Sequence, residues 1–151
     1  MTLRVLRSIT VAAALFAATA ALAASTTTIS RDAPDLTSVK AKVKAKDFAG
    51  ALAELKPMLD THHHADVYNL MGFSLRKTGD IKQGGEYYVK ALELDPKHKG
   101  ALEYQGQMFV ELGDMAKAKA NLKRLVTLCP KGCEERADLA KAIATAPAAK
   151  K

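Results

Sequence analysis

The sequence contains few of the residues that build β-sheets. Aromatic residues make up 5% of the 151 positions, and tryptophan is absent. Aromatic and β-branched residues favour strands, whereas many apolar residues here are alanines, which favour closely packed helices. Two cysteines are too few for a disulfide framework. The length allows one modest domain and excludes a large multidomain enzyme.

The patterns that mark catalytic sites are also missing. We find no Ser/His/Asp set in a suitable context, no glycine-rich phosphate loop after a strand, and no His/Glu metal signature. We therefore expect a protein that is not an enzyme and that carries no cofactor.

The N-terminal residues 1–23 have the pattern of a signal peptide. Arg4 and Arg7 precede an apolar stretch over residues 9–20, and Ala21-Leu22-Ala23 follows with small residues where signal peptidase cleaves. The alternative is an uncleaved anchor, but the apolar stretch is shorter than the roughly 20 residues of a membrane span. We expect cleavage after Ala23.

Export would change the charge and the compartment. Loss of Arg4 and Arg7 lowers the formal charge from +7 to +5, and no later stretch is apolar enough to span a membrane. We expect a periplasmic protein, with secretion as the alternative. Residues 24–34 are rich in Ser and Thr at their start and predict a flexible lead-in.

A repeat of 34 residues organises the rest of the chain. Residues 65–98 and 99–132 align without a gap, which is typical of stacked repeat architectures. The matched pairs are Gly72 with Gly106, Gly79-Asp80 with Gly113-Asp114, Gly84 with Ala118, and Pro96 with Pro130.

Each unit is predicted to hold two helices. The first ends at Gly-Asp and the second is stopped by Pro96 or Pro130. Gly72 and Gly106 lie inside the first helices, which indicates close approach of the partner helix. Gly84-Gly85 predicts a local weakness or hinge. We expect the second helices to face inward through Ile81, Tyr88, Ala91, Leu94, Met115, Leu122, Leu125 and Leu128.

The two units are flanked by less regular segments. Residues 35–64 resemble a degenerate unit, in which Pro57 should kink the second helix or end it early. Residues 133–145 predict a capping helix, and residues 146–151 a frayed tail. The apolar side of the capping helix should comprise Ala137, Leu139, Ala140, Ile143 and Ala144, with Arg136 as the polar exception.

The pattern of these units resembles the tetratricopeptide repeat family. The shared positions in the first clear unit are Tyr68, Met71-Gly72, Leu75, Gly79-Asp80, Gly84, Tyr88, Ala91 and Pro96. In the second they are Leu102, Gln105-Gly106, Phe109, Gly113-Asp114, Ala118, Leu122, Leu125 and Pro130. The resemblance implies an all-α fold, a right-handed α-solenoid of about three units plus a C-terminal capping helix.

The resemblance also implies a function. Members of the family bind a peptide or partner protein in a concave groove lined by the first helices, as non-enzymatic scaffolds or adaptors. The groove residues that it implies here are Asp66, Asn69, Phe73, Arg76, Lys77, Glu103, Gln107, Val110 and Glu111. Only Asn69, Arg76 and Lys77 suit a clamp for a C-terminal carboxylate, and Glu103 and Glu111 oppose one. We expect recognition of another kind, and self-association through exposed helix faces remains an alternative.

The two cysteines lie close together in the sequence. In an oxidising compartment, Cys129 and Cys133 should form a disulfide across the turn into the capping helix. A redox-active pair would need C-x-x-C spacing in a thioredoxin-like context, and this pair has neither.

A run of histidines and a run of lysines have functional and structural interpretations. His62, His63 and His64 could bind metal, but three consecutive rings cannot converge on one ion in a helix, so we expect a solvated polar turn. The alternative function is metal or redox handling in the periplasm by these histidines and the cysteine pair. The lysines at positions 40, 42, 44 and 46 predict a solvated face that could attract acidic partners or an anionic membrane surface; no nucleic-acid binding is expected.

Overall fold

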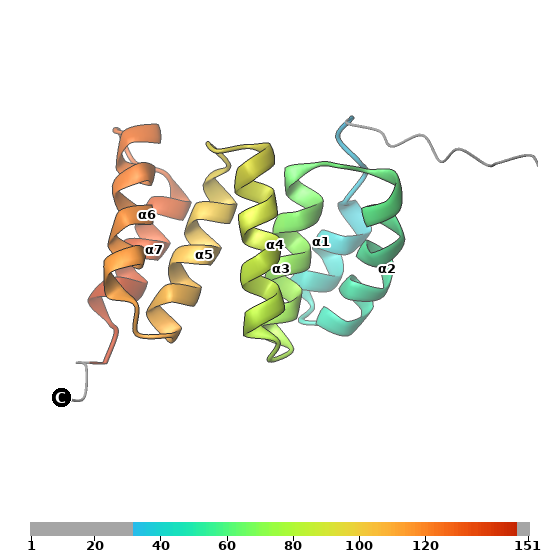
Figure 1. The fold of residues 1–151 in the computed structure, drawn as a ribbon, viewed down its shortest axis with the longest axis horizontal. Coiled ribbons are helices and arrows are strands. Elements are labelled where there is room, and N and C mark those ends of the chain that lie inside the picture. Colours follow the sequence, from blue (N-terminus) through green and yellow to red (C-terminus); the bar gives the residue numbers. More distant parts are fainter. Residues whose placement is uncertain (1–31, 148–151) are drawn as a thin grey trace, which may run out of the picture.

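The computed structural model describes residues 32–147, which form seven α-helices in three antiparallel pairs followed by a single helix (Figure 1). The predicted all-α repeat solenoid is confirmed. Residues 1–23, most of the predicted lead-in and most of the predicted tail lie outside the described residues. The helices are α1 (Thr37–Lys44), α2 (Phe48–Thr61), α3 (Ala65–Lys77), α4 (Ile81–Leu94), α5 (Lys99–Glu111), α6 (Met115–Leu128) and α7 (Glu134–Ala144).

No helix within residues 32–147 is long and apolar enough to cross a membrane.

The same turn joins the two helices of every pair. An aspartate caps the second helix by accepting a hydrogen bond from the backbone N–H three residues later. Asp47 accepts from Gly50 at 2.9 Å, Asp80 from Gln83 at 3.0 Å and Asp114 from Lys117 at 3.1 Å. The same capping hydrogen bond is therefore present in all three helix pairs.

The residue before each capping aspartate is left-handed. Gly79 has a φ of 99° and Gly113 a φ of 76°, whereas Lys46 takes the equivalent place with a φ of 61°. A side chain in this conformation costs roughly 1–2 kcal/mol, so the first unit carries backbone strain that the glycines avoid in the other two.

The apolar core has two buried clusters. One joins the first three helices, through Leu36, Val39, Ala51, Leu55, Val67, Leu70, Met71 and Leu75. The other joins α5, α6 and α7 through Leu102, Leu125 and Leu139. Tyr88 of α4, which lies in the sequence between the residues of the two clusters, is also fully buried. Leu139 of α7 is fully buried in the second cluster, so α7 packs against α5 and α6.

The backbones of α3 and α4 approach closely at two glycines. A Cβ added to Gly72 would lie 2.8 Å from the carbonyl oxygen of Gly84 and 2.9 Å from the Tyr88 ring. The predicted close approach at Gly72 is confirmed. Gly84-Gly85 does not interrupt α4, which continues from Ile81 to Leu94, and Gly84 is buried in the contact. At Gly106 the space is filled instead by Leu139 of α7.

Three local expectations need correction. Helix α2 runs past Pro57 to Thr61, so the predicted early end is wrong, whereas the predicted kink stays a prediction; Pro57 is exposed, so the carbonyl that loses its partner can face water. Leu94 is 49% exposed because it is the last residue of α4. Ala137 and Ala144 are exposed because the covered side of α7 turns toward Glu135 and Arg136, which have polar partners.

We predict that Gly72→Ala lowers the free energy of unfolding by about 2–3 kcal/mol, because the added methyl group meets backbone and a buried ring. Gly85→Ala is the matched control in α4. Its Cβ would meet only the flexible end of Met108 at 3.2 Å, and alanine gains about 1 kcal/mol of helix propensity. Urea unfolding followed by circular dichroism measures both; an equal loss in the two variants would contradict the close contact.

Candidate functional site

The first helices of the units and α7 line one hollow of about 440 Å³. Residues at matching repeat positions contribute from successive helices: Asp66, Gly100 and Glu134 form one series, and Leu70, Tyr104 and Asp138 form another, each at the 34-residue offset. The hollow therefore runs across α3, α5 and α7, and each of these helices contributes residues at the same two repeat positions. Its other lining residues are Lys40, Val43, Lys44, Asn69, His98, Glu103 and Glu135.

Apart from Asp66 of α3, which lies 2.8 Å from His98 Nε2, the charges of this hollow are separated. Glu134, Glu135 and Asp138 line it from α7, and Glu103 lines it from α5. Lys40 and Lys44 line it from α1. A ligand in the hollow would thus meet carboxylates at the C-terminal end of the array and ammonium groups at the N-terminal end.

Glu103 is a buried acid in this hollow. Its residue is 6% exposed, and its Oε1 accepts a hydrogen bond from Gln107 Nε2 at 2.8 Å. Burial, together with smaller effects of the nearby carboxylates of Asp138, Glu135 and Glu134 and against an opposing effect of Arg76, raises the pKa of Glu103 to about 7. Glu103 can therefore change its charge near neutral pH.

Asn69 occupies the equivalent position in α3, one repeat offset before Glu103. It is 5% exposed, it lines the same hollow, and its Oδ1 has no hydrogen-bond partner among the described residues. Buried polar atoms are seldom left unpaired, so this acceptor marks a place where a donor is missing.

Arg76 connects α3 to α5. Its side chain is 1% exposed; Nη1 donates to Glu111 Oε1 and Nη2 donates to Gln107 Oε1 at 3.2 Å. The guanidinium also lies 5.6 Å from the centre of the Phe73 ring, and that ring is 4.5 Å from Tyr104. The carboxylate of Glu111 thus neutralises the arginine within the fold.

The nine predicted groove residues fall into three groups. Asp66, Asn69 and Glu103 line the hollow of about 440 Å³. A second hollow of about 330 Å³, next to the end of α7, is lined by Gln107, Val110 and Glu111. The third group is Phe73, Arg76 and Lys77, which line neither hollow. These three side chains lie close together: Lys77 Nζ is 5.5 Å from the centre of the Phe73 ring.

The lining residues that sequence reasoning missed are Lys40, Val43, Lys44, Leu70, His98, Gly100, Tyr104, Glu134, Glu135 and Asp138. A signal for Glu134 and Asp138 existed. Continuing the 34-residue offset past Gly132 places Glu134 and Asp138 at the groove positions of Gly100 and Tyr104.

Two of the histidines are helix caps. His64 Nδ1 accepts from the backbone N–H of Asp66 at 3.3 Å, and His98 Nδ1 accepts from Ala101 at 3.0 Å. The Nε2 of His98 also lies 2.8 Å from Asp66 Oδ1. Within residues 32–147, no three His, Cys, Asp or Glu side chains are grouped so that they could hold a metal ion.

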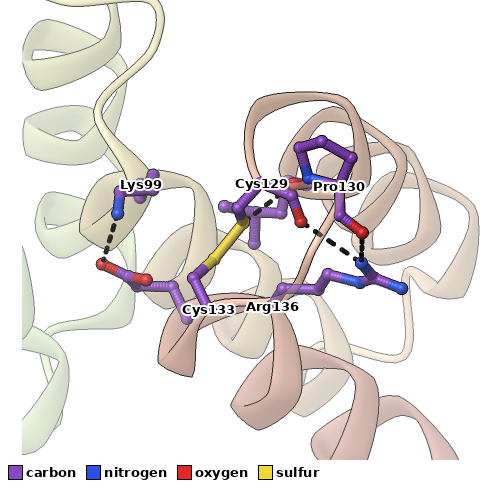
Figure 2. Close-up of a disulfide and its surroundings, with 7 residues drawn as sticks. Lys99, Cys129, Pro130, Cys133 and Arg136 are labelled. Atoms are coloured by element: carbon purple, nitrogen blue, oxygen red, sulfur yellow. Dashed lines mark hydrogen bonds and ion pairs between the residues drawn. A yellow bond between two sulfur atoms is a disulfide. The ribbon is translucent and has the colours of Figure 1, made fainter.

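The turn between α6 and α7 brings the two cysteines together (Figure 2). Their sulfur atoms are 2.08 Å apart and their Cα atoms 6.0 Å apart, a separation that a disulfide can span. Arg136 closes the same turn by donating to the carbonyl oxygens of Cys129 and Pro130 at 3.2 and 3.1 Å. Lys99 of α5 reaches Glu135 of α7 at 3.7 Å.

Comparison with known proteins agrees with the units seen here. The model of the tetratricopeptide repeat family matches residues 65–98 and 105–131. The uncharacterized protein ycf37 of Pyropia yezoensis is 28% identical over 64 residues, which is 42% of this chain. The match covers 36% of that protein, so the chain spans about a third of the length of this relative.

We predict that Glu103→Gln stabilises the protein at pH 8 but not at pH 4. Because the pKa of Glu103 rises from 4.5 to about 7 on folding, wild type loses stability as pH increases through this range. Glutamine keeps an acceptor for Gln107 and cannot ionise. With allowance for solvent screening, the gain at pH 8 should be about 1–2 kcal/mol.

Urea unfolding of both proteins at several pH values measures this difference. Glu86→Gln, which alters an exposed acid of α4, is the control and should differ from wild type by a constant amount. A Glu103→Gln effect that does not change with pH would contradict the buried-acid interpretation.

Proposed function

The chain belongs to the tetratricopeptide repeat family, and on that premise we propose that it is an adaptor that binds a segment of a partner protein in the hollow lined by α1, α3, α5 and α7. Proteins built from this repeat serve as interaction scaffolds and are typically non-enzymatic. The observation that carries the proposal is the series of groove positions in register, from Asp66 through Gly100 to Glu134 and from Leu70 through Tyr104 to Asp138.

The shape of the hollow supports a segment rather than a small molecule. It draws on four helices that are consecutive first members of the units, so its walls follow the array axis. A solenoid presents such a surface to extended or helical partners. The polar groups along the hollow can pair with a partner's backbone and side chains.

Site-specific photocrosslinking tests the location of binding. We expect a photoreactive residue at Lys44, which is exposed and lines the hollow, to capture a partner from extracts of the native host. The same residue at Lys82, which is exposed on α4, is the matched control and should capture little. Equal capture at the two positions, or capture only at Lys82, would exclude the hollow as the binding surface.

We also propose that the protein acts in the periplasm, with secretion as the alternative. The support is the arrangement of Arg4, Arg7, the apolar residues 9–20 and Ala21-Leu22-Ala23. An oxidising compartment would favour a bond between Cys129 and Cys133, which lie within bonding distance. The short closed loop would stabilise the α6–α7 turn by about 2 kcal/mol.

Intact-mass analysis of the protein from its native host checks both points. The expected species begins at Ala24 and is lighter by two hydrogens than the reduced chain. A species that retains residues 1–23 would refute cleavage. If a thiol-alkylating reagent adds two groups to the protein, both cysteines are free thiols, and the disulfide is refuted.

A further inference from the structure

The acidic end of the hollow indicates what kind of partner it receives. Resting on the function proposed above, we propose that the bound segment places one cationic side chain, lysine or arginine, between Glu103, Asn69 and the first turns of α7.

The first argument is uncompensated negative charge. Glu134 and Asp138 are four residues apart on α7, where like charges repel, and both line the hollow with Glu103. Within residues 32–147, none of these three carboxylates forms an ion pair. The helix N-terminus favours Glu134 and Glu135, but this effect falls off within the first turn of α7, and Asp138 lies beyond that turn.

The second argument is the unpaired amide of Asn69. Its buried Oδ1 lacks a donor, and carboxylates cannot supply one because they only accept hydrogen bonds when ionised. An ammonium group carries three donors and a guanidinium five. A cation in the hollow could donate to Asn69 and to a carboxylate at once, which answers both observations with one group.

The opposite wall limits how basic the segment can be. Lys40 and Lys44 line the hollow from α1 and would repel further positive charge. The site therefore suits a single cation oriented toward α7, and it disfavours a polybasic tract. Because Lys40 and Lys44 repel the cation, they also set the orientation of the bound segment: its cationic part lies toward α7 and its other end toward α1.

Cation binding should depend on the protonation of Glu103. A positive charge beside this acid favours its ionised form, so binding strengthens as pH rises and Glu103 loses its proton. Asp138, Glu135 and Glu134 face it from α7 and Arg76 from α3, and glutamine at position 103 removes the dependence.

The experiment is peptide selection with the chain from Ala24 to Lys151, using a phage library of random dodecapeptides. We expect enrichment of lysine or arginine at one position of the selected peptides. Replacing that lysine with norleucine in a synthetic peptide should weaken binding to wild type roughly tenfold, as expected for loss of a charge-assisted contact.

Matched variants show whether Glu103 contacts the cation directly. The lysine peptide should bind Glu103→Gln and Asp138→Asn more weakly than wild type, and Glu86→Gln as well as wild type. The norleucine peptide should bind wild type and Glu103→Gln equally. Affinity for the lysine peptide should increase from pH 6 to pH 8 in wild type and stay constant in Glu103→Gln.

The outcomes separate the two proposals. Selected peptides that compete for the Lys44 crosslink but carry no preferred cation would overturn this inference and leave the binding function intact. Selection of polybasic peptides that bind wild type and Glu103→Gln equally would also overturn it. If no peptide is selected and crosslinking at Lys44 does not exceed that at Lys82, the proposed groove function fails as well.

Discussion

The contact between the backbones of α3 and α4 at Gly72 and Gly84 is the constraint on which the array depends. Helix α3 belongs to the apolar cluster of the first three helices, and α4 packs against α5, which belongs to the other cluster. The two clusters are therefore joined through one helix pair. Because the glycines leave no room between the helices, Tyr88 is held fully buried, and α3 keeps a set position relative to α5 for the residues that line the hollow.

The architecture could be predicted from sequence because its signals are local. Gly-Asp at a fixed offset marks the end of one helix and the cap of the next, and this chemistry does not depend on distant residues. Lys46-Asp47 shows that the aspartate alone preserves the turn when glycine is absent. The errors at Pro57 and Leu94 have a common cause, since periodicity does not show which residues at a helix end or outer face meet solvent.

The site was less predictable because it depends on pairings between units. Arg76 fits a ligand-binding residue in sequence, but Glu111 lies 35 positions later and neutralises it across the α3–α5 interface. Conversely, Glu134 and Asp138 have the helical pattern of a solvated face, and the placement of α7 beside α5 puts them in the same hollow as Glu103. The repeat positions within a unit could thus be predicted from the sequence, whereas the pairing of charges between units could be seen only in the structure.

Helix α7 is half of a unit: among residues 32–147, no second helix follows it. The inner side of the array consequently has four helices, α1, α3, α5 and α7, whereas the outer side has three. Eleven residues of α7 extend the inner surface by one full helix width, where a complete unit would require about three times as many. Arg136 anchors this unpaired helix by donating to the carbonyl oxygens of Cys129 and Pro130, so a small protein presents a longer footprint than its number of complete units implies.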